Sequence, residues 1–293
     1  MGFIIGTGRC GTSMLAQMLN SHSKICVPHE LQILFEYSNN GSRLYEIFEE
    51  RRNERFGSED FVELIKNICP HKFHEYFDYR GFFEKQRYPV RNLKELANRL
   101  YAEITESKNK NILIEQTPWY GQRIDILNEL FPDAKYIHMI RDGRDVAISF
   151  ARTPWWHNDI AQNLERWDIE VKQIISSAEK LLNHNQFLQV RYEDFVENPE
   201  SGLMRICAFL GVEFESPMLD ASTYIDYGLY RKTGIGAVSS VAMNEWAKSK
   251  NAPTFKGSLY AWKSHTDFDF SRIPAHISQS LRAFGYETTT CCR

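Results

Sequence analysis

Short apolar runs recur along the chain, and each is bounded by polar or turn residues. Four of them stand out, at residues 3–5, 112–114, 136–140 and 187–190. Runs of this length that end at turn signals are typical of buried strands. The first run ends at Gly6, and apolar residues then repeat at helical spacing from Ser13 to Leu19. The N-terminal segment is therefore predicted to be a strand, a glycine-rich turn and a helix.

Two longer stretches later in the chain have the periodicity of amphipathic helices. They cover residues 160–182 and 199–210, and the second ends at Gly211, a common residue just after a helix. Strands that alternate with helices predict an α/β fold with a mostly parallel sheet flanked by helices. With a glycine-rich loop after its first strand, this fold is predicted to be P-loop-like.

The stretch from about residue 36 to residue 110 departs from this pattern. It is dense in charged and aromatic residues and shows no clear strand. We interpret it as a mostly helical insertion after the first strand–helix unit. It is either a lid that faces an acceptor or a plain cap with a small core of its own. Because no linker interrupts the rest, residues 1–293 are predicted to form a single domain.

Composition and charge narrow the classes of function. The net charge of −3 gives no global basic field that would point to nucleic acid or an anionic membrane. No apolar run approaches the roughly 18 residues that span a bilayer. The six cysteines are scattered as free thiols are in a reducing compartment, which predicts a cytoplasmic location. The first strand has almost no lead-in, as in a domain excised from a longer protein.

The turn after the first predicted strand is a near-match to a nucleotide-binding loop. Residues 6–13, GTGRCGTS, follow the pattern G-x-x-x-x-G-K-[ST], except that Thr12 stands at the lysine position. Backbone N–H groups in such a turn at a helix N-terminus form an anion site. Arg9 can hold two oxygens of a phosphate or sulfate at once, and Ser13 adds a hydroxyl donor. The alternative is a tight turn without a ligand.

A second candidate anion site follows the apolar run at 136–140. Arg141 ends that predicted strand, Asp142-Gly143 forms a turn, and Ser149 lies on the next helix. A fixed guanidinium and a helix hydroxyl at this spacing suit a terminal phosphate monoester. In the alternative interpretation, the four charged residues within 141–145 pair among themselves. Two anion sites at two strand ends suit a nucleotide with phosphates at both ends of its ribose.

These motifs resemble those of the PAPS-dependent sulfotransferases, and the bacterial and tyrosylprotein branch is the most similar in style. The resemblance rests on GTGRCGTSML at residues 6–15 and IRDGRDVAIS at residues 140–149. EQTP, VRYEDF and RICAFLG extend it, at residues 115–118, 190–195 and 205–211. The motifs occur in the family's order, whereas the chain beyond them matches loosely.

The resemblance implies a sulfuryl donor, 3′-phosphoadenosine 5′-phosphosulfate (PAPS), which lies across the sheet edge and leaves as adenosine 3′,5′-bisphosphate (PAP). Carried over by position, the 5′-phosphosulfate is held by Arg9, Cys10, Gly11, Thr12 and Ser13, the 3′-phosphate by Arg141 and Ser149, and the nucleotide is contacted by Tyr192. No metal is implied, because a phosphosulfate carries less charge than a triphosphate and the sequence holds no metal-ligand cluster.

Sulfuryl transfer is physically similar to phosphoryl transfer, so catalysis is expected to consist mostly of positioning and charge stabilisation. Arg9 is suited to neutralise the bridging oxygen as the 5′-phosphate leaves. A hydroxyl acceptor needs a general base. The tyrosylprotein enzymes have a glutamate at the position of Glu30, which makes Glu30 the first candidate. His29 is the second, because an unperturbed imidazole titrates at about pH 6.5.

The predicted function is transfer of a sulfuryl group from PAPS to a hydroxyl, or less readily an amine, of a carbohydrate, lipid, peptide or polyketide. A P-loop-type small-molecule kinase is the first alternative, disfavoured by Thr12 at the lysine position. A sulfotransferase domain that acts on a carrier-tethered acyl chain in a megaenzyme stays open, as does a nucleotide-binding module without catalysis. The sequence does not identify the acceptor.

Overall fold

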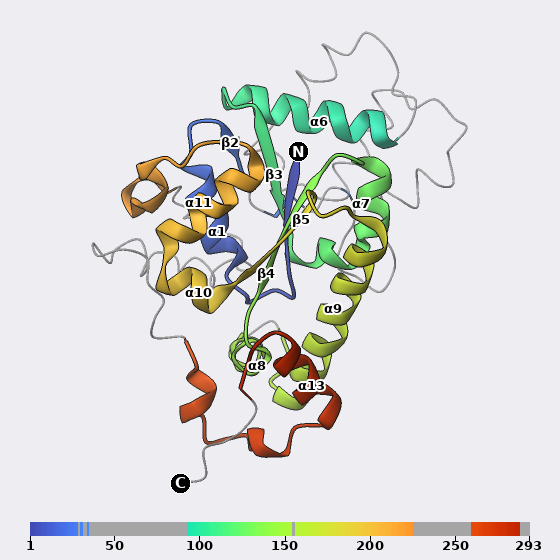
Figure 1. The fold of residues 1–293 in the computed structure, drawn as a ribbon, viewed down its shortest axis with the longest axis vertical. Helices are drawn as coiled ribbons and strands as arrows, with labels where there is room; N and C mark the ends of the chain where they lie inside the picture. The colour runs from blue at the N-terminus through green and yellow to red at the C-terminus, as the bar shows by residue number, and fades with distance from the viewer. Residues whose placement is uncertain (29, 32–33, 35–92, 154–155, 225–258, 288–293) are drawn as a thin grey trace.

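In the part of the chain that the structure describes, five parallel strands form a central sheet. The computed structural model describes residues 1–28, 30–31, 34, 93–153, 156–224 and 259–287. The strands are β1 (Gly2–Ile5), β2 (Ile25–Cys26), β3 (Ile112–Gln116), β4 (Lys135–Ile140) and β5 (Phe187–Arg191). They follow the order β2–β3–β1–β4–β5 (Figure 1), and each pairing is parallel. All carboxyl ends therefore lie along one edge.

The winding of the chain changes direction at β1. From β1 the chain runs outward to β2, returns through β3, and then crosses β1 to reach β4 and β5. Ligands of open α/β sheets bind outside the carboxyl ends of the strands at such a switch point. Ile5 of β1 lies opposite His138 of β4. The loops that follow these two strands therefore emerge next to each other, and both candidate anion motifs lie in them.

Helices cover both faces of the sheet (Figure 1). Their bounds are α1 (Thr12–Asn20), α6 (Leu93–Ser107), α7 (Ile124–Leu130), α8 (Gly143–Ala151), α9 (Ile160–Leu181), α10 (Tyr192–Glu197), α11 (Pro199–Leu210) and α13 (Ala275–Ala283). Side chains of a strand point alternately to its two faces. Phe3 and Ile5 accordingly pack with α6, α7 and α9, whereas Ile4 packs with α1, α10 and α11.

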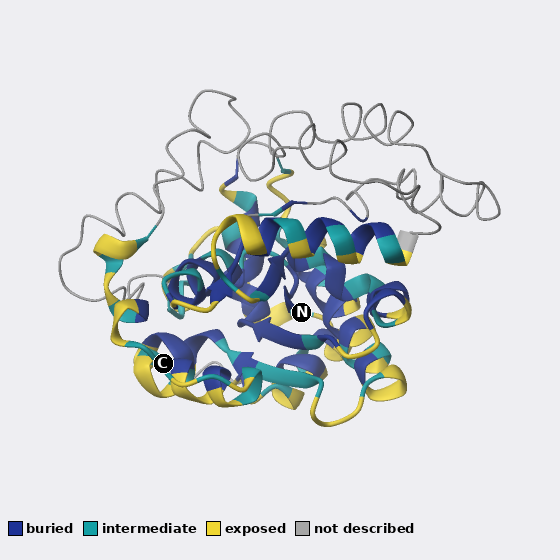
Figure 2. Ribbon diagram, turned by 90° about the horizontal axis from the view of Figure 1, so that it is seen from above, coloured by how far each residue is buried: buried dark blue, intermediate teal, exposed yellow. Residues whose placement is uncertain are grey.

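A third core cluster lies beyond the carboxyl end of β4. Residues of α8 and α9 pack there against Ile277 and Leu281 of α13 and against Tyr286. This cluster attaches the C-terminal segment (residues 259–287) to the sheet edge where the candidate motifs lie. Figure 2 shows the inner strands as buried, β5 as mostly intermediate, and the exposed residues on the outer faces of the helices and in the turns.

The pattern of apolar runs predicted this architecture closely. Each of the four predicted strands is found, and the long helices end at Leu181 and Leu210. Gly211 is the C-cap of α11 with φ 81°, a left-handed conformation that favours glycine. Helix α6 falls inside the predicted insertion at about 36–110, but most of that stretch and His29 lie outside the described residues. Among the described helices, none is both long and apolar enough to cross a lipid bilayer.

Candidate functional site

The β1–α1 loop (residues 6–11) has a backbone that few side chains tolerate. Gly8, Arg9 and Gly11 have φ values of 75°, 54° and 93°. A Cβ atom on Gly11 would lie 2.4 Å from Cδ2 of Tyr192. Glycine is therefore required at this position both for the backbone conformation and for the close approach of the Tyr192 ring.

The loop leads directly into the N-terminus of α1. Gly11 is the N-cap and offers no capping side chain. The N–H groups of the first helical turn and the positive end of the helix dipole therefore face the loop. Thr12 is buried, and Gln116 Nε2 donates a hydrogen bond to its Oγ1 at 3.3 Å. This contact fixes Thr12 at the carboxyl end of β3.

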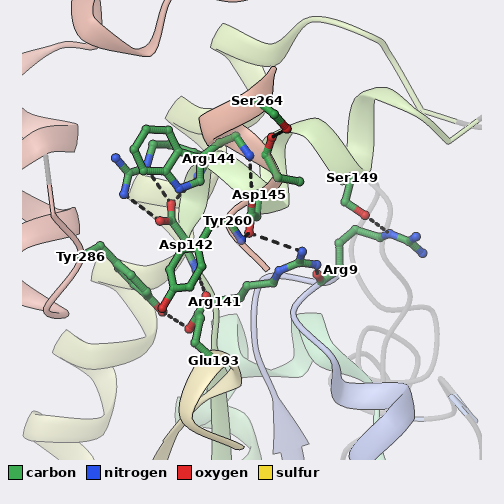
Figure 3. A network of polar contacts seen from close by, with 12 residues as sticks. Arg9, Arg141, Asp142, Arg144, Asp145, Ser149, Glu193, Tyr260, Ser264 and Tyr286 are labelled. Carbon is green, nitrogen blue, oxygen red and sulfur yellow. Dashed lines mark hydrogen bonds and ion pairs between the residues drawn. The ribbon is translucent and has the colours of Figure 1, made fainter. Parts of the chain in front are cut away.

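The two candidate motifs meet through hydrogen bonds of two arginines (Figure 3). Arg9 Nε donates to Ser149 Oγ at 3.1 Å, and Arg141 Nη1 donates to the Arg9 carbonyl oxygen at 3.1 Å. The Arg141 guanidinium also lies over the Tyr192 ring, 4.7 Å from its centroid. The fold thus brings together four side chains that the sequence nominated from three separate segments.

The electrostatics of Arg9 indicate a concentration of positive charge. Burial lowers the pKa of Arg9, and the neighbouring Arg141 lowers it further, whereas Glu30 acts in the opposite direction. Two guanidinium groups held this close favour an anion between or beside them. The charge of Glu30 lies within electrostatic reach of Arg9, which places the first base candidate next to the loop.

Glu30 follows β2 and has an unusual backbone. Its φ of 35° is in the left-handed region, as is that of Arg9. Such conformations cost energy in residues with a Cβ and are found preferentially at functional sites. Glu30 is half-buried. Its position near Arg9, together with this strain, distinguishes it from an ordinary surface glutamate.

Cys10 and Ser13 complete the predicted donor-binding set. Cys10 is fully buried in the core next to α1, and burial raises the pKa of its thiol to about 11. Its neutral side chain therefore packs inside the protein, and only its backbone can face an anion. Ser13 is partly exposed in the first turn of α1.

The β4–α8 turn (residues 141–145) is braced by buried charges. Asp142 accepts two hydrogen bonds from the Arg144 guanidinium, Nε to Oδ1 at 2.9 Å and Nη2 to Oδ2 at 2.7 Å. The Asp142 backbone N–H donates to Glu193 Oε1 at 3.0 Å, and the Tyr286 hydroxyl donates to Oε2 at 3.0 Å. Residues from α10 and the C-terminal segment therefore hold the turn (Figure 3).

Asp145 fastens the C-terminal segment to the same turn. Its carboxylate accepts the backbone N–H groups of Tyr260 and Trp262 at 2.8 and 3.0 Å and lies 3.6 Å from Arg141 Nη2. The Arg144 guanidinium lies over the Trp262 ring at 3.5 Å. The alternative of a turn that pairs its own charges is therefore correct for Arg144 with Asp142 and for Arg141 with Asp145. It coexists with the contact between Arg141 and Arg9.

Sequence reasoning did not nominate the residues that support these two motifs. Glu193, Trp262 and Tyr286 lie in other segments, and their contacts depend on the tertiary fold. One available signal was the density of charge in residues 141–145, since four charged residues at a predicted strand end need partners if they are buried.

Comparison with known proteins gives a consistent family. Residues 3–216 match the model of a protein family that is described as the sulfotransferase family. Protein-tyrosine sulfotransferase A of Caenorhabditis elegans is 32% identical over 112 residues, which cover 36% of this chain and 29% of that protein. Protein-tyrosine sulfotransferase 2 of Gallus gallus is 25% identical over 169 residues, 55% of this chain and 43% of that protein. The chain thus spans less than half the length of these relatives.

Two solved structures share the fold over nearly the whole chain. The sulfotransferase domain of the Synechococcus PCC 7002 olefin synthase has a TM-score of 0.64 at 22% identity and covers 98% of this chain and 94% of that one. A sulfotransferase domain from the curacin biosynthetic pathway has a TM-score of 0.61 at 20% identity, with 97% of each chain covered. The family resemblance and the α/β fold predicted from the sequence are confirmed.

Proposed function

The chain belongs to the sulfotransferase family, and from that premise we propose that it transfers a sulfuryl group from PAPS to an acceptor hydroxyl. The proposal rests on the direct contact between the two anion motifs. Arg9 hydrogen-bonds to Ser149, and Arg141 hydrogen-bonds to the Arg9 carbonyl, at the carboxyl edge of β1 and β4.

The residues present fit a nucleotide with anions at both ends. In the proposal, Arg9 and the N–H groups of residues 10–13 bind the 5′-phosphosulfate, with the hydroxyls of Thr12 and Ser13 as further donors. Arg141 and Ser149 bind the 3′-phosphate, and Tyr192 lies beside the nucleotide. The donor set supports this assignment, because guanidinium groups, hydroxyls and a helix N-terminus are the groups that bind phosphate and sulfate in proteins.

In the proposed reaction, the protein stabilises the charge on the leaving oxygen and accepts a proton from the acceptor. PAPS, when bound, supplies the sulfuryl group and leaves as PAP. The Arg9 guanidinium stabilises negative charge on the oxygen that departs with the 5′-phosphate, from a half-buried position where such an interaction is stronger than in water. Glu30 accepts the proton of the attacking hydroxyl, whose oxygen forms the new bond to sulfur as the bond from sulfur to the bridging oxygen breaks. His29 is the second candidate for this base.

Paired variants test the assignment of the base. In E30A, sulfuryl transfer is expected to fall by about 10²–10⁴-fold, the typical contribution of general acid–base catalysis. PAP affinity should change little in E30A, and H29A is the matched control for the neighbouring position. Wild-type turnover in E30A would refute the choice of Glu30, and a large loss in H29A alone would move the role to His29.

The acceptor class requires a direct assay. Relatives include protein-tyrosine sulfotransferases and an omega-hydroxy-beta-dihydromenaquinone-9 sulfotransferase. A suitable panel for labelled PAPS therefore contains a tyrosine peptide, a lipid alcohol, a carbohydrate and a carrier-tethered hydroxyacyl chain. Transfer to one class identifies the acceptor. Saturable PAPS binding without any transfer favours a binding module, and binding of ATP with Mg²⁺ but not of PAP favours the kinase alternative.

The cytoplasmic location also stays a proposal. The described cysteines Cys10, Cys26 and Cys207 are free and buried, which supports a reducing compartment. Fractionation of cells with an antibody against the protein would test it, and recovery from an oxidising compartment would contradict it.

A further inference from the structure

Arg166 of α9 contacts the β1–α1 loop from a distant part of the chain. Its Nη2 donates a hydrogen bond to the Thr7 carbonyl oxygen at 2.8 Å, across 159 positions of sequence. The same guanidinium is paired with Glu170 one helical turn away, Nε to Oε1 at 2.7 Å and Nη2 to Oε2 at 3.0 Å. None of the roles assigned above involves this arginine.

Aromatic rings fix the plane of the Arg166 guanidinium. Its Cζ lies 4.3 Å from the ring centroid of Phe150 and 4.8 Å from that of Trp156. The Phe150 ring also packs on the loop, because a Cβ on Gly8 would lie 3.1 Å from its Cζ. Phe150 follows Ser149 on α8, so Arg166 is held by the helix that carries one of the nominated phosphate ligands.

The hydrogen bond to Thr7 determines which way one peptide unit of the loop faces. A trans peptide is planar, so its C=O and the following N–H point in opposite directions. With the Thr7 oxygen held toward α9, the Gly8 N–H points the other way. Gly8 has φ 75°, and glycine allows this peptide to turn over at little cost. If the peptide between Thr7 and Gly8 turned over, its carbonyl oxygen and its N–H group would exchange the sides of the loop toward which they point.

We propose that Arg166 is a positioning residue that holds the β1–α1 loop in the conformation that binds the 5′-phosphosulfate, an inference that rests on the proposed function. Its charge is already neutralised by Glu170, so it orients the loop backbone and is not a further ligand of the donor. Arg141 has a similar effect on the peptide between Arg9 and Cys10, because it donates a hydrogen bond to the Arg9 carbonyl oxygen.

Nucleotides that differ in one phosphate separate this role from a general effect on folding. PAP carries both phosphates, whereas adenosine 3′-monophosphate lacks the 5′ group that the loop is proposed to hold. In R166M, calorimetric titration should show a loss of PAP affinity of about tenfold, the size expected for one hydrogen bond from a charged donor. Affinity for adenosine 3′-monophosphate should change by less than about twofold.

Two further variants complete the experiment. R166K keeps the charge but not the planar fork, and should fall between wild type and R166M. K172M is the matched control, because Lys172 pairs with Asp168 at the same i,i+4 spacing on α9. Its affinities should equal those of wild type.

The possible results test the positioning role of Arg166 separately from the proposed function. Equal losses for both nucleotides in R166M, or no loss for either, would overturn the positioning role. If R166M does not fold, the same comparison in R166K decides the matter. Failure of the wild-type protein to bind PAP would instead refute the proposed function.

Discussion

The β1–α1 loop and the β4–α8 turn are both nominated anion sites, but they are built in different ways. The loop is shaped by backbone conformation, with Gly8, Arg9 and Gly11 at positive φ. Side chains from α8, α9 and α10, and Arg141 of the β4–α8 turn, hold it from outside. The turn contains its own buried ion pair between Arg144 and Asp142 and is closed by the C-terminal segment.

This difference has a consequence for mutations. Removing the Arg9 side chain from the loop should alter ligand binding with a small effect on folding, because this side chain is only half-buried and donates to the neutral hydroxyl of Ser149. Removing a charge from the turn leaves its partner buried without compensation, which is costly. Stability and activity should therefore respond to different residues on the two sides of the same site.

The largest expected effect on stability comes from Asp142→Ala. The substitution leaves the Arg144 guanidinium, only 2% exposed, without its carboxylate, and should lower the free energy of unfolding by about 3–5 kcal/mol. Urea denaturation measures this. R272A is the control, because Arg272 and Asp269 form a solvent-exposed pair three positions apart, and its effect should be much smaller. Similar small losses in both variants would show that the turn is not braced by its charges.

The β1–α1 loop should give the opposite pattern in Arg9→Ala. We expect kcat/KM for sulfuryl transfer to fall by about 10²–10³-fold, the range for loss of one donor that stabilises transition-state charge. The free energy of unfolding should change by less than about 1 kcal/mol, because burial already lowers the pKa of Arg9 and so opposes its charge. Steady-state kinetics and urea denaturation on the same preparation test both statements. A large loss of stability would remove the contrast with the turn.

A smaller predicted effect is the pH dependence of the contribution that Glu193 makes to stability at the β4–α8 turn. Burial raises the pKa of Glu193, against the hydrogen bond from the Asp142 N–H. Between the ordinary glutamate pKa of about 4.3 and this raised value, the folded protein binds a proton more tightly than the unfolded chain. The contribution of Glu193 to stability therefore falls as pH rises through this window.

The Glu193→Gln variant isolates this contribution. Its side chain does not titrate, so the free energy of unfolding of wild type minus that of E193Q should decrease as pH rises through the window and level off above it. Urea denaturation at a series of pH values measures the difference. A difference that increases with pH would mean that the hydrogen bonds to Glu193 outweigh its burial.

Much of the fold and the nominated site could be predicted from the sequence, because both depend on local patterns. Apolar runs located β1, β3, β4 and β5 but not the two-residue strand β2, and the spacing within residues 6–15 and 140–149 nominated Arg9, Arg141 and Ser149. Arg166 could not be found this way. Its pairing with Glu170 has the same i,i+4 spacing as that of Asp168 with Lys172, with the order of the charges reversed, although Lys172 is 52% exposed and Arg166 19%. The spacing does not show that Arg166 contacts the loop, which follows from the packing of α9 on it.

The hydrogen bond between Arg9 and Ser149 was also beyond sequence reasoning. The motifs predicted two separate anion sites, whereas the parallel pairing of β1 with β4 brings the side chains into contact. The contacts of Asp145 with Tyr260 and Trp262 likewise join segments that are more than a hundred residues apart. Long-range contacts of this kind follow from strand order, which a single sequence does not specify.

The central claim is that two anion sites bind the two ends of one nucleotide, and calorimetric titration of the wild-type protein tests it most directly. The titrants are PAP, adenosine 5′-monophosphate and adenosine 3′-monophosphate, without added metal. The account predicts that PAP binds at least about tenfold more tightly than either monophosphate, because each phosphate contributes its own charged contacts. Equal affinity for PAP and one monophosphate, or no binding of PAP, would contradict it.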